Sequence, residues 1–88
     1  MSTKYRTKPP ITLGQLRAGM PKGVEEFKPV RKRYEVPHFA ITDGRHYVWA
    51  YEKTLGVVEF EEHGHCLSAR DLLAKVAAAF NISIESIP

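Results

Sequence analysis

The chain has 88 residues, of which 43% are hydrophobic, 26% charged and 10% aromatic. This length fits one small domain, and the composition excludes wholesale disorder and a fibrous repeat. No apolar run approaches the roughly 20 residues needed to cross a bilayer, and the single cysteine, Cys66, cannot form an internal disulfide. We therefore expect a cytoplasmic protein without a membrane segment.

Positive charge is concentrated in the first third of the sequence. Residues 1–35 carry nine basic and three acidic side chains, a balance of +6, whereas residues 36–88 have a balance of −3. A basic segment suits a polyanion such as nucleic acid or an acidic protein surface, and equally a solvated tail. Because residues 1–10 are polar and end in two prolines, we expect a flexible basic arm there, followed by a single domain over residues 11–88.

A short helix is expected over residues 12–20. Thr12 is a suitable N-cap, apolar residues follow at helical spacing, and Gly19 marks the end. Residues 22–30 contain glycine and proline and are interpreted as a connection.

The sequence Asp43-Gly44 separates two runs rich in aromatic and β-branched residues. It predicts a two-residue hairpin turn between strands at residues 33–42 and 45–53. Pro37 cannot donate a backbone hydrogen bond, so the first of these strands should lie at an edge or carry a bulge.

A third strand is expected at residues 57–62, after a three-residue turn that ends in Gly56 with positive φ. The predicted sheet is therefore a three-stranded antiparallel meander.

The alanine-rich run at residues 68–80 has apolar residues on one helical face and predicts a C-terminal helix. Ser68 is its candidate N-cap, Asn81 suits a left-handed C-terminal cap, and residues 82–84 alternate as a short strand does. The expected fold class is α+β, with this helix packed on one face of the meander.

Pairing across the predicted hairpin divides its side chains between two faces of the sheet. The aliphatic face receives Phe39, Ile41, Val48 and Ala50 and should carry the helix. The other face, which the helix leaves uncovered, receives Tyr34, Val36, His38, Tyr47, Trp49 and Tyr51.

The register of the third strand stays open at this point. A three-residue turn adds Val58 and Phe60 to the aliphatic face and sets Glu59 and Glu61 opposite Tyr51 and Trp49, respectively. A two- or four-residue loop would instead place Val58 and Phe60 beside Trp49 and make the aromatic face the core.

The segment His63-Gly64-His65-Cys66 holds three possible metal ligands, whereas a structural zinc site needs four. We favour instead a polar turn that ends in a cysteine packed as a small apolar residue. The sequence also lacks a phosphate-binding glycine pattern. For a thiol enzyme, His63 and His65 lie close to Cys66, but nothing else in the sequence indicates an oxyanion hole or a pocket. We expect no metal, no cofactor and no enzymatic activity.

The predicted order of helix, three strands and helix over residues 12–80 resembles in outline the double-stranded RNA-binding domain. The start of that family's second helix is rich in lysine, whereas Ser68-Ala69-Arg70-Asp71 offers one arginine. The resemblance is limited to topology, and membership is not inferred from it.

Together these features predict a small nucleic-acid-binding or regulatory accessory module. The alternative is a protein-binding adaptor or inhibitor, such as mobile elements encode, that uses the aromatic sheet face or a sheet edge. The protein would be a monomer, or a homodimer joined through the aromatic face. The residues expected to contact nucleic acid are Lys4, Arg6, Lys8, Arg31, Lys32, Arg33, Arg45, Tyr47 and Trp49.

Overall fold

The computed structural model describes residues 2–33, 36–53, 56–63 and 69–88. In chain order, its elements are β1 (Ser2–Lys8), α1 (Leu13–Ala18), β2 (Glu25–Arg33), β3 (Val36–Thr42), β4 (Tyr47–Glu52), β5 (Val58–His63), α2 (Arg70–Phe80) and β6 (Ser83–Ile87).

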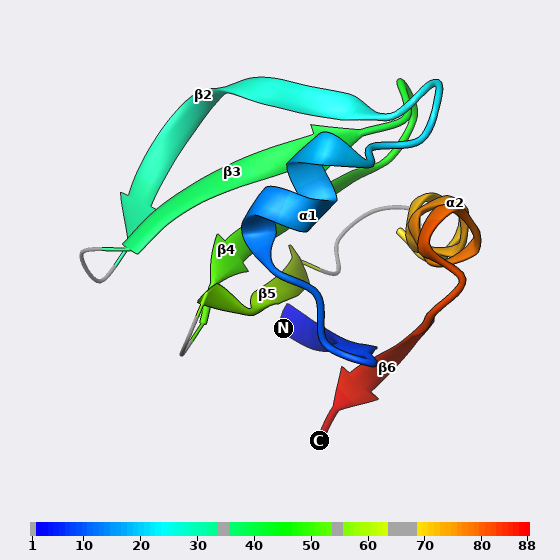
Figure 1. Cartoon of the computed structure of the whole chain (residues 1–88). Coiled ribbons are helices and arrows are strands. Elements are labelled where there is room, and N and C mark those ends of the chain that lie inside the picture. Colours follow the sequence, from blue (N-terminus) through cyan, green and yellow to red (C-terminus); the bar gives the residue numbers. More distant parts are fainter. Residues whose placement is uncertain (1, 34–35, 54–55, 64–68) are drawn as a thin grey trace.

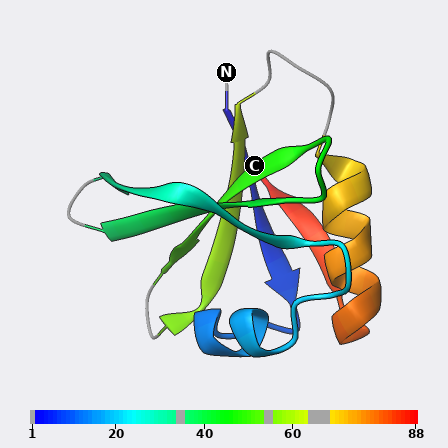
Figure 2. The same ribbon diagram turned by 90° about the horizontal axis from the view of Figure 1, so that it is seen from above.

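The strands form one six-stranded antiparallel sheet in the order β2-β3-β4-β5-β1-β6. The sheet curls, so that β2 and β3 arch over one side of the core while β1 and β6 close the other (Figure 1). Both helices lie inside this curve, along different borders of the sheet (Figure 2). The α+β class is confirmed, and the predicted meander, β3-β4-β5, is the middle of a larger sheet.

The flexible arm predicted for residues 1–10 is wrong. Residues 2–8 form β1, which pairs with β5 on one side and with β6 on the other. Tyr5 and Thr7 are buried, whereas Lys4, Arg6 and Lys8 alternate with them and are exposed. This is the period-two pattern of a strand with one buried face.

The predicted N-terminal helix is confirmed as α1. The Thr12 side chain accepts the backbone N–H of Gln15 at 3.0 Å, and the Gln15 side chain accepts the N–H of Thr12 at 2.8 Å, which is a complete capping box. Arg17 fixes the helix on the sheet, because its guanidinium lies 4.6 Å from the ring centroid of Phe39 and its Nε donates to Glu26 at 2.6 Å.

The connection predicted for residues 22–30 is also wrong, because most of it belongs to β2. The register of β2 against β3 shifts between Phe27 and Arg31, and Pro29 lies within this irregular stretch. An edge strand with a bulge tolerates a residue that cannot donate a hydrogen bond. The strand with Pro37, β3, was expected at an edge or with a bulge; it is internal, and the irregularity of its pairing with β2 lies on β2.

The hairpin turn is longer than predicted. Thr42 pairs with Tyr47, so residues 43–46 form a four-residue connection, and His38 pairs with Tyr51 rather than with Trp49. A shift of two residues leaves each side chain on its predicted face.

The third strand, β5, adopts the register of a three-residue turn. Ala50 pairs with Phe60, Tyr51 with Glu59 and Trp49 with Glu61. Gly56 has φ +79°, as predicted, whereas residues 54 and 55 lie outside the described part of the chain. The face with Phe60 therefore belongs to the core.

The C-terminal helix is confirmed as α2, which buries Leu72, Leu73 and Val76 against the aliphatic face of the sheet. Asn81 ends it at φ 52° and ψ 48°, the predicted left-handed cap, and β6 follows. The candidate N-cap, Ser68, lies outside the described residues, and Ala69 precedes the first helical residue.

The topology differs from the outline of the double-stranded RNA-binding domain. Four strands, not three, lie between the helices, and β1 and β6 extend the sheet beyond them. Within the described residues, no helix has the length and apolar content that a membrane span requires.

Candidate functional site

The sheet has an outer face that points away from both helices, and β4 supplies its aromatic residues. Val48 and Ala50 of β4 are buried beneath the helices, whereas Tyr47, Trp49 and Tyr51 alternate with them. The division into an aliphatic and an aromatic face, predicted from the sequence, is confirmed for the residues whose side chains are described.

The most exposed aromatic side chains of the outer face are Phe27 and Tyr47. They are 46% and 53% exposed, and their ring centroids lie 5.2 Å apart at an interplanar angle of 70°. The two rings reach each other across β3, since Phe27 is paired with Ala40 and Tyr47 with Thr42. Together with the half-buried Trp49, they form what we call the aromatic patch.

Phe27 was not predicted at this face, because residues 22–30 were interpreted as a connection. The signal for a strand was weak there, since Pro29 interrupts the alternation after Glu25-Glu26-Phe27. Once the strand is placed beside β3, Phe27 lies on the same face as Tyr47.

The remaining part of the predicted aromatic face is covered. His38 and Tyr51 stack with ring centroids 4.6 Å apart, and they are only 6% and 7% exposed. The Tyr51 hydroxyl donates to the Glu59 carboxylate at 2.8 Å, and burial together with this carboxylate raises the pKa of Tyr51. We assign His38 and Tyr51 to the packing of the sheet. Tyr34 lies outside the described residues.

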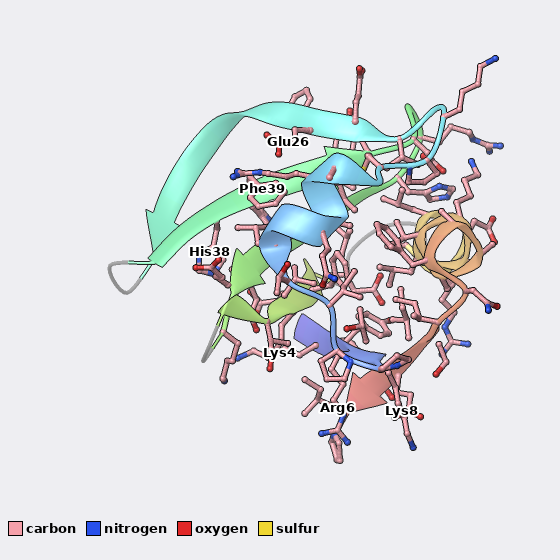
Figure 3. The ribbon with its side chains drawn as sticks, viewed as in Figure 1. Lys4, Arg6, Lys8, Glu26, His38 and Phe39 are labelled. Carbon is pink, nitrogen blue, oxygen red and sulfur yellow. The ribbon has the colours of Figure 1, made fainter. Side chains whose placement is uncertain are left out.

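The basic residues of β1 project from the outer face, away from the helices (Figure 3). The register sets Lys4 opposite Glu61 on β5, and it sets Arg6 between Glu59 on β5 and Glu85 on β6. Opposite charges at directly paired positions attract each other and reduce the field that reaches a distant ligand. Lys4, Arg6 and Lys8 form a row on β1 in which Lys4 and Arg6 are paired with acidic residues, whereas Lys8 is paired with Ser83.

The second predicted basic group, Arg31 to Arg33, lies on β2 at the far end of the sheet order. Three strands separate β2 from β1, which corresponds to about 19 Å along the sheet at ~4.8 Å per strand. The single positive cluster expected from the sequence is thus divided into two. On β2, Arg31 is paired with His38 and Arg33 with Val36.

Arg45 lies in the connection between β3 and β4 and is exposed. Its position is fixed by Asp43, whose carboxylate accepts the backbone N–H groups of Arg45 at 3.0 Å and of His46 at 2.8 Å. The Lys75 ammonium of α2 donates to the same carboxylate at 3.1 Å. These donors, the two backbone groups first, hold the pKa of Asp43 well below its usual range.

The possible metal ligands of the sequence are not brought together in the part of the chain that the structure describes. Its described residues contain no group of three histidine, cysteine, aspartate or glutamate side chains that could hold a metal ion. His65 and Cys66 lie outside these residues, and His63 is the last residue of β5.

Comparisons with protein families, with curated proteins and with solved structures find no match for this chain.

Proposed function

We propose that the protein is a small non-enzymatic module that binds single-stranded nucleic acid on the β2-β3-β4 half of its outer face. The observation that supports this proposal best is the exposed pair Phe27 and Tyr47, with Trp49 beside it. Aromatic rings exposed on a sheet stack unpaired bases, and each stacked base contributes roughly 1 to 3 kcal/mol.

Two groups of cations belong to the same half of the sheet as the aromatic patch. Arg45 is exposed two residues before Tyr47, and Arg31, Lys32 and Arg33 follow Phe27 along β2. A nucleic acid strand that stacks on the patch would carry its phosphates toward these cations.

The row on β1 is left out of the proposed site. A nucleic acid that extended from the aromatic patch to Lys4 or Arg6 would have to cross Glu61 and Glu59, whose carboxylates repel phosphates. Of the cations predicted to contact nucleic acid, four then remain, Arg31, Lys32, Arg33 and Arg45, and a single-stranded nucleic acid releases about 0.7 counterion per contact. We therefore expect a salt slope of at most about three.

A titration of fluorescein-labelled 15-mers of deoxythymidine and of uridine, followed by anisotropy at about 50 mM salt, tests this proposal. Tyr47→Ala removes one stacking ring and should weaken binding about 5- to 150-fold, the equivalent of about 1 to 3 kcal/mol. Arg45→Ala should weaken binding and lower the salt slope by about 0.7. Lys8→Ala, an exposed cation on β1, is the matched control and should change neither quantity.

Folded protein that binds neither oligonucleotide would contradict the proposal. It would leave the protein-binding alternative, in which the same rings pack on a partner protein or on a second copy of the chain. Equal losses for Lys8→Ala and Arg45→Ala would show that charge alone, and not the patch, attracts the nucleic acid.

A further inference from the structure

A second surface lies at the opposite border of the sheet, where β6 is the last strand. Its inner neighbour is β1, and none of the described strands pairs with its outer edge. An unpaired edge presents backbone N–H and C=O groups that can pair with another extended segment.

A cavity of about 350 Å³ adjoins this edge on the core side of the sheet. Its wall is formed by α2 and by β6 itself, so that Leu73 and Ala77 face Ile84 at its apolar end. The volume is near the small end of the ~300 to 1,000 Å³ range of ligand pockets, which suits one or two side chains.

The other end of the cavity is polar and is formed by Tyr5, Arg70 and Ser86. Tyr5 is paired with Ser86 in the sheet, and its hydroxyl donates to the Glu62 carboxylate, which also accepts the Ala69 N–H at 2.9 Å. Burial, and then Glu62, raises the pKa of this hydroxyl, while Arg70 acts in the opposite direction. Arg70, which lines this end, repels a cation, and Glu62, which holds the Tyr5 hydroxyl but does not line the cavity, repels an anion, so this end favours an uncharged polar group.

We propose that β6 and this cavity bind an extended peptide of a partner protein, which adds to the sheet as a seventh strand. Alternate residues of the peptide face the cavity, as Ile84 and Ser86 do on β6. The peptide therefore places an aliphatic side chain against Leu73 and Ala77, and an uncharged polar side chain two residues away. This inference does not depend on nucleic acid binding, because the two surfaces lie at opposite ends of the sheet.

A second copy of the chain is a poorer occupant than a foreign peptide. Antiparallel pairing of β6 with its own copy over all five residues sets Glu85 directly opposite Glu85, and like charges at such positions are destabilising.

Selection from a phage-displayed library of random nine-residue peptides tests the proposal. We expect enriched peptides to share an aliphatic residue and to lack a charged residue two positions from it. Bound synthetic peptide should slow amide hydrogen exchange in β6, and methylation of the peptide backbone nitrogens should abolish binding.

The matched variants are Ala74→Phe, at an exposed position that lines the cavity, and Ala79→Phe, at an exposed position of α2 outside the lining. Ala74→Phe should weaken the binding of an enriched peptide at least tenfold, and Ala79→Phe should weaken it less than twofold. Oligonucleotide binding should be unchanged in both variants. A library without enrichment, enriched peptides that bind Ala74→Phe as tightly as the wild type, or a dimer that buries β6 in sedimentation would each overturn the proposal.

Discussion

Asp43 shows how a single carboxylate sets the geometry of a turn. The pair Asp43-Gly44 predicts a two-residue turn, yet the connection has four residues. The cause is the Asp43 side chain, which accepts two backbone N–H groups of the connection and reproduces the hydrogen bonding of a tight turn. Gly44 supplies the positive φ, at 93°. The location of the turn was therefore predictable from the sequence, and its length was not.

Replacing Asp43 with alanine should destabilise the protein by about 1 to 3 kcal/mol at pH 7, because the backbone N–H groups of Arg45 and His46 lose a charged hydrogen-bond acceptor. The pKa of Asp43 is lower in the folded protein than in the unfolded chain, so its contribution is complete above the unfolded value and declines as the pH falls below about 4. Urea unfolding of the wild type and of Asp43→Ala at several pH values measures this difference. If the difference in the free energy of unfolding between the two proteins grew below pH 4, the lowered pKa of Asp43 in the folded protein would be contradicted.

At the scale of elements, the strands with few apolar residues, β1 and β2, were hardest to recognise. Among residues 3–8 of β1, whose burial is described, only Tyr5 and Thr7 are buried, and a buried threonine between basic residues does not resemble a hydrophobic strand. β2 is interrupted by Pro29. The segments with several apolar residues, β3, β4, β5 and α2, were predicted in their approximate positions. A buried face requires apolar residues at every second position of a strand or at helical spacing in a helix, and this pattern is visible in the sequence.

The two glycines of the α1 region predict opposite effects of the same substitution. An added Cβ at Gly14 has Thr12 Oγ1 at 3.9 Å as its nearest neighbour, so Gly14→Ala should stabilise the protein by about 0.5 to 1 kcal/mol. At Gly19 the Cβ would lie 2.7 Å from the ring of Phe80 at the end of α2, and Gly19→Ala should cost about 1 to 3 kcal/mol.

Thermal unfolding of the two glycine variants measures the contact between α1 and the end of α2. A double variant, Gly19→Ala with Phe80→Leu, should recover part of the loss, because the smaller side chain makes room. Equal stabilisation by both alanine substitutions would show that the two helices do not approach each other in this way.

At the scale of the whole molecule, the N-terminal residues are part of the sheet and not an appendage. β1 lies between β5 and β6, so the curved sheet is interrupted without it. Removal of residues 1–8 should therefore abolish cooperative unfolding. The triple variant Lys4→Ser, Arg6→Ser and Lys8→Ser removes the charges but keeps Tyr5 and Thr7, and it should remain folded. A truncated chain with an unchanged unfolding transition, measured by circular dichroism, would contradict the position of β1.

The arrangement of charge over the whole molecule could not be predicted from the sequence. Nine basic residues close together in the first third suggest one positive region, but the strand order places β1 and β2 on either side of the meander. Local patterns do not determine which distant strands become neighbours, since that depends on long-range pairing. The placement of Tyr47 and Trp49 on the outer face depended only on alternation within β4 and could be predicted from the sequence, whereas the placement of Phe27 depended on the pairing of β2 with β3.

The proposed interface is tested most directly by mapping backbone amide chemical shifts in the ¹⁵N-labelled protein during titration with a deoxythymidine octamer. The proposal predicts shifts at Phe27, Arg45, Tyr47 and Trp49, with the amides of β1 unchanged. Shifts confined to Lys4, Arg6 and Lys8, or no shifts at all at millimolar oligonucleotide, would contradict it.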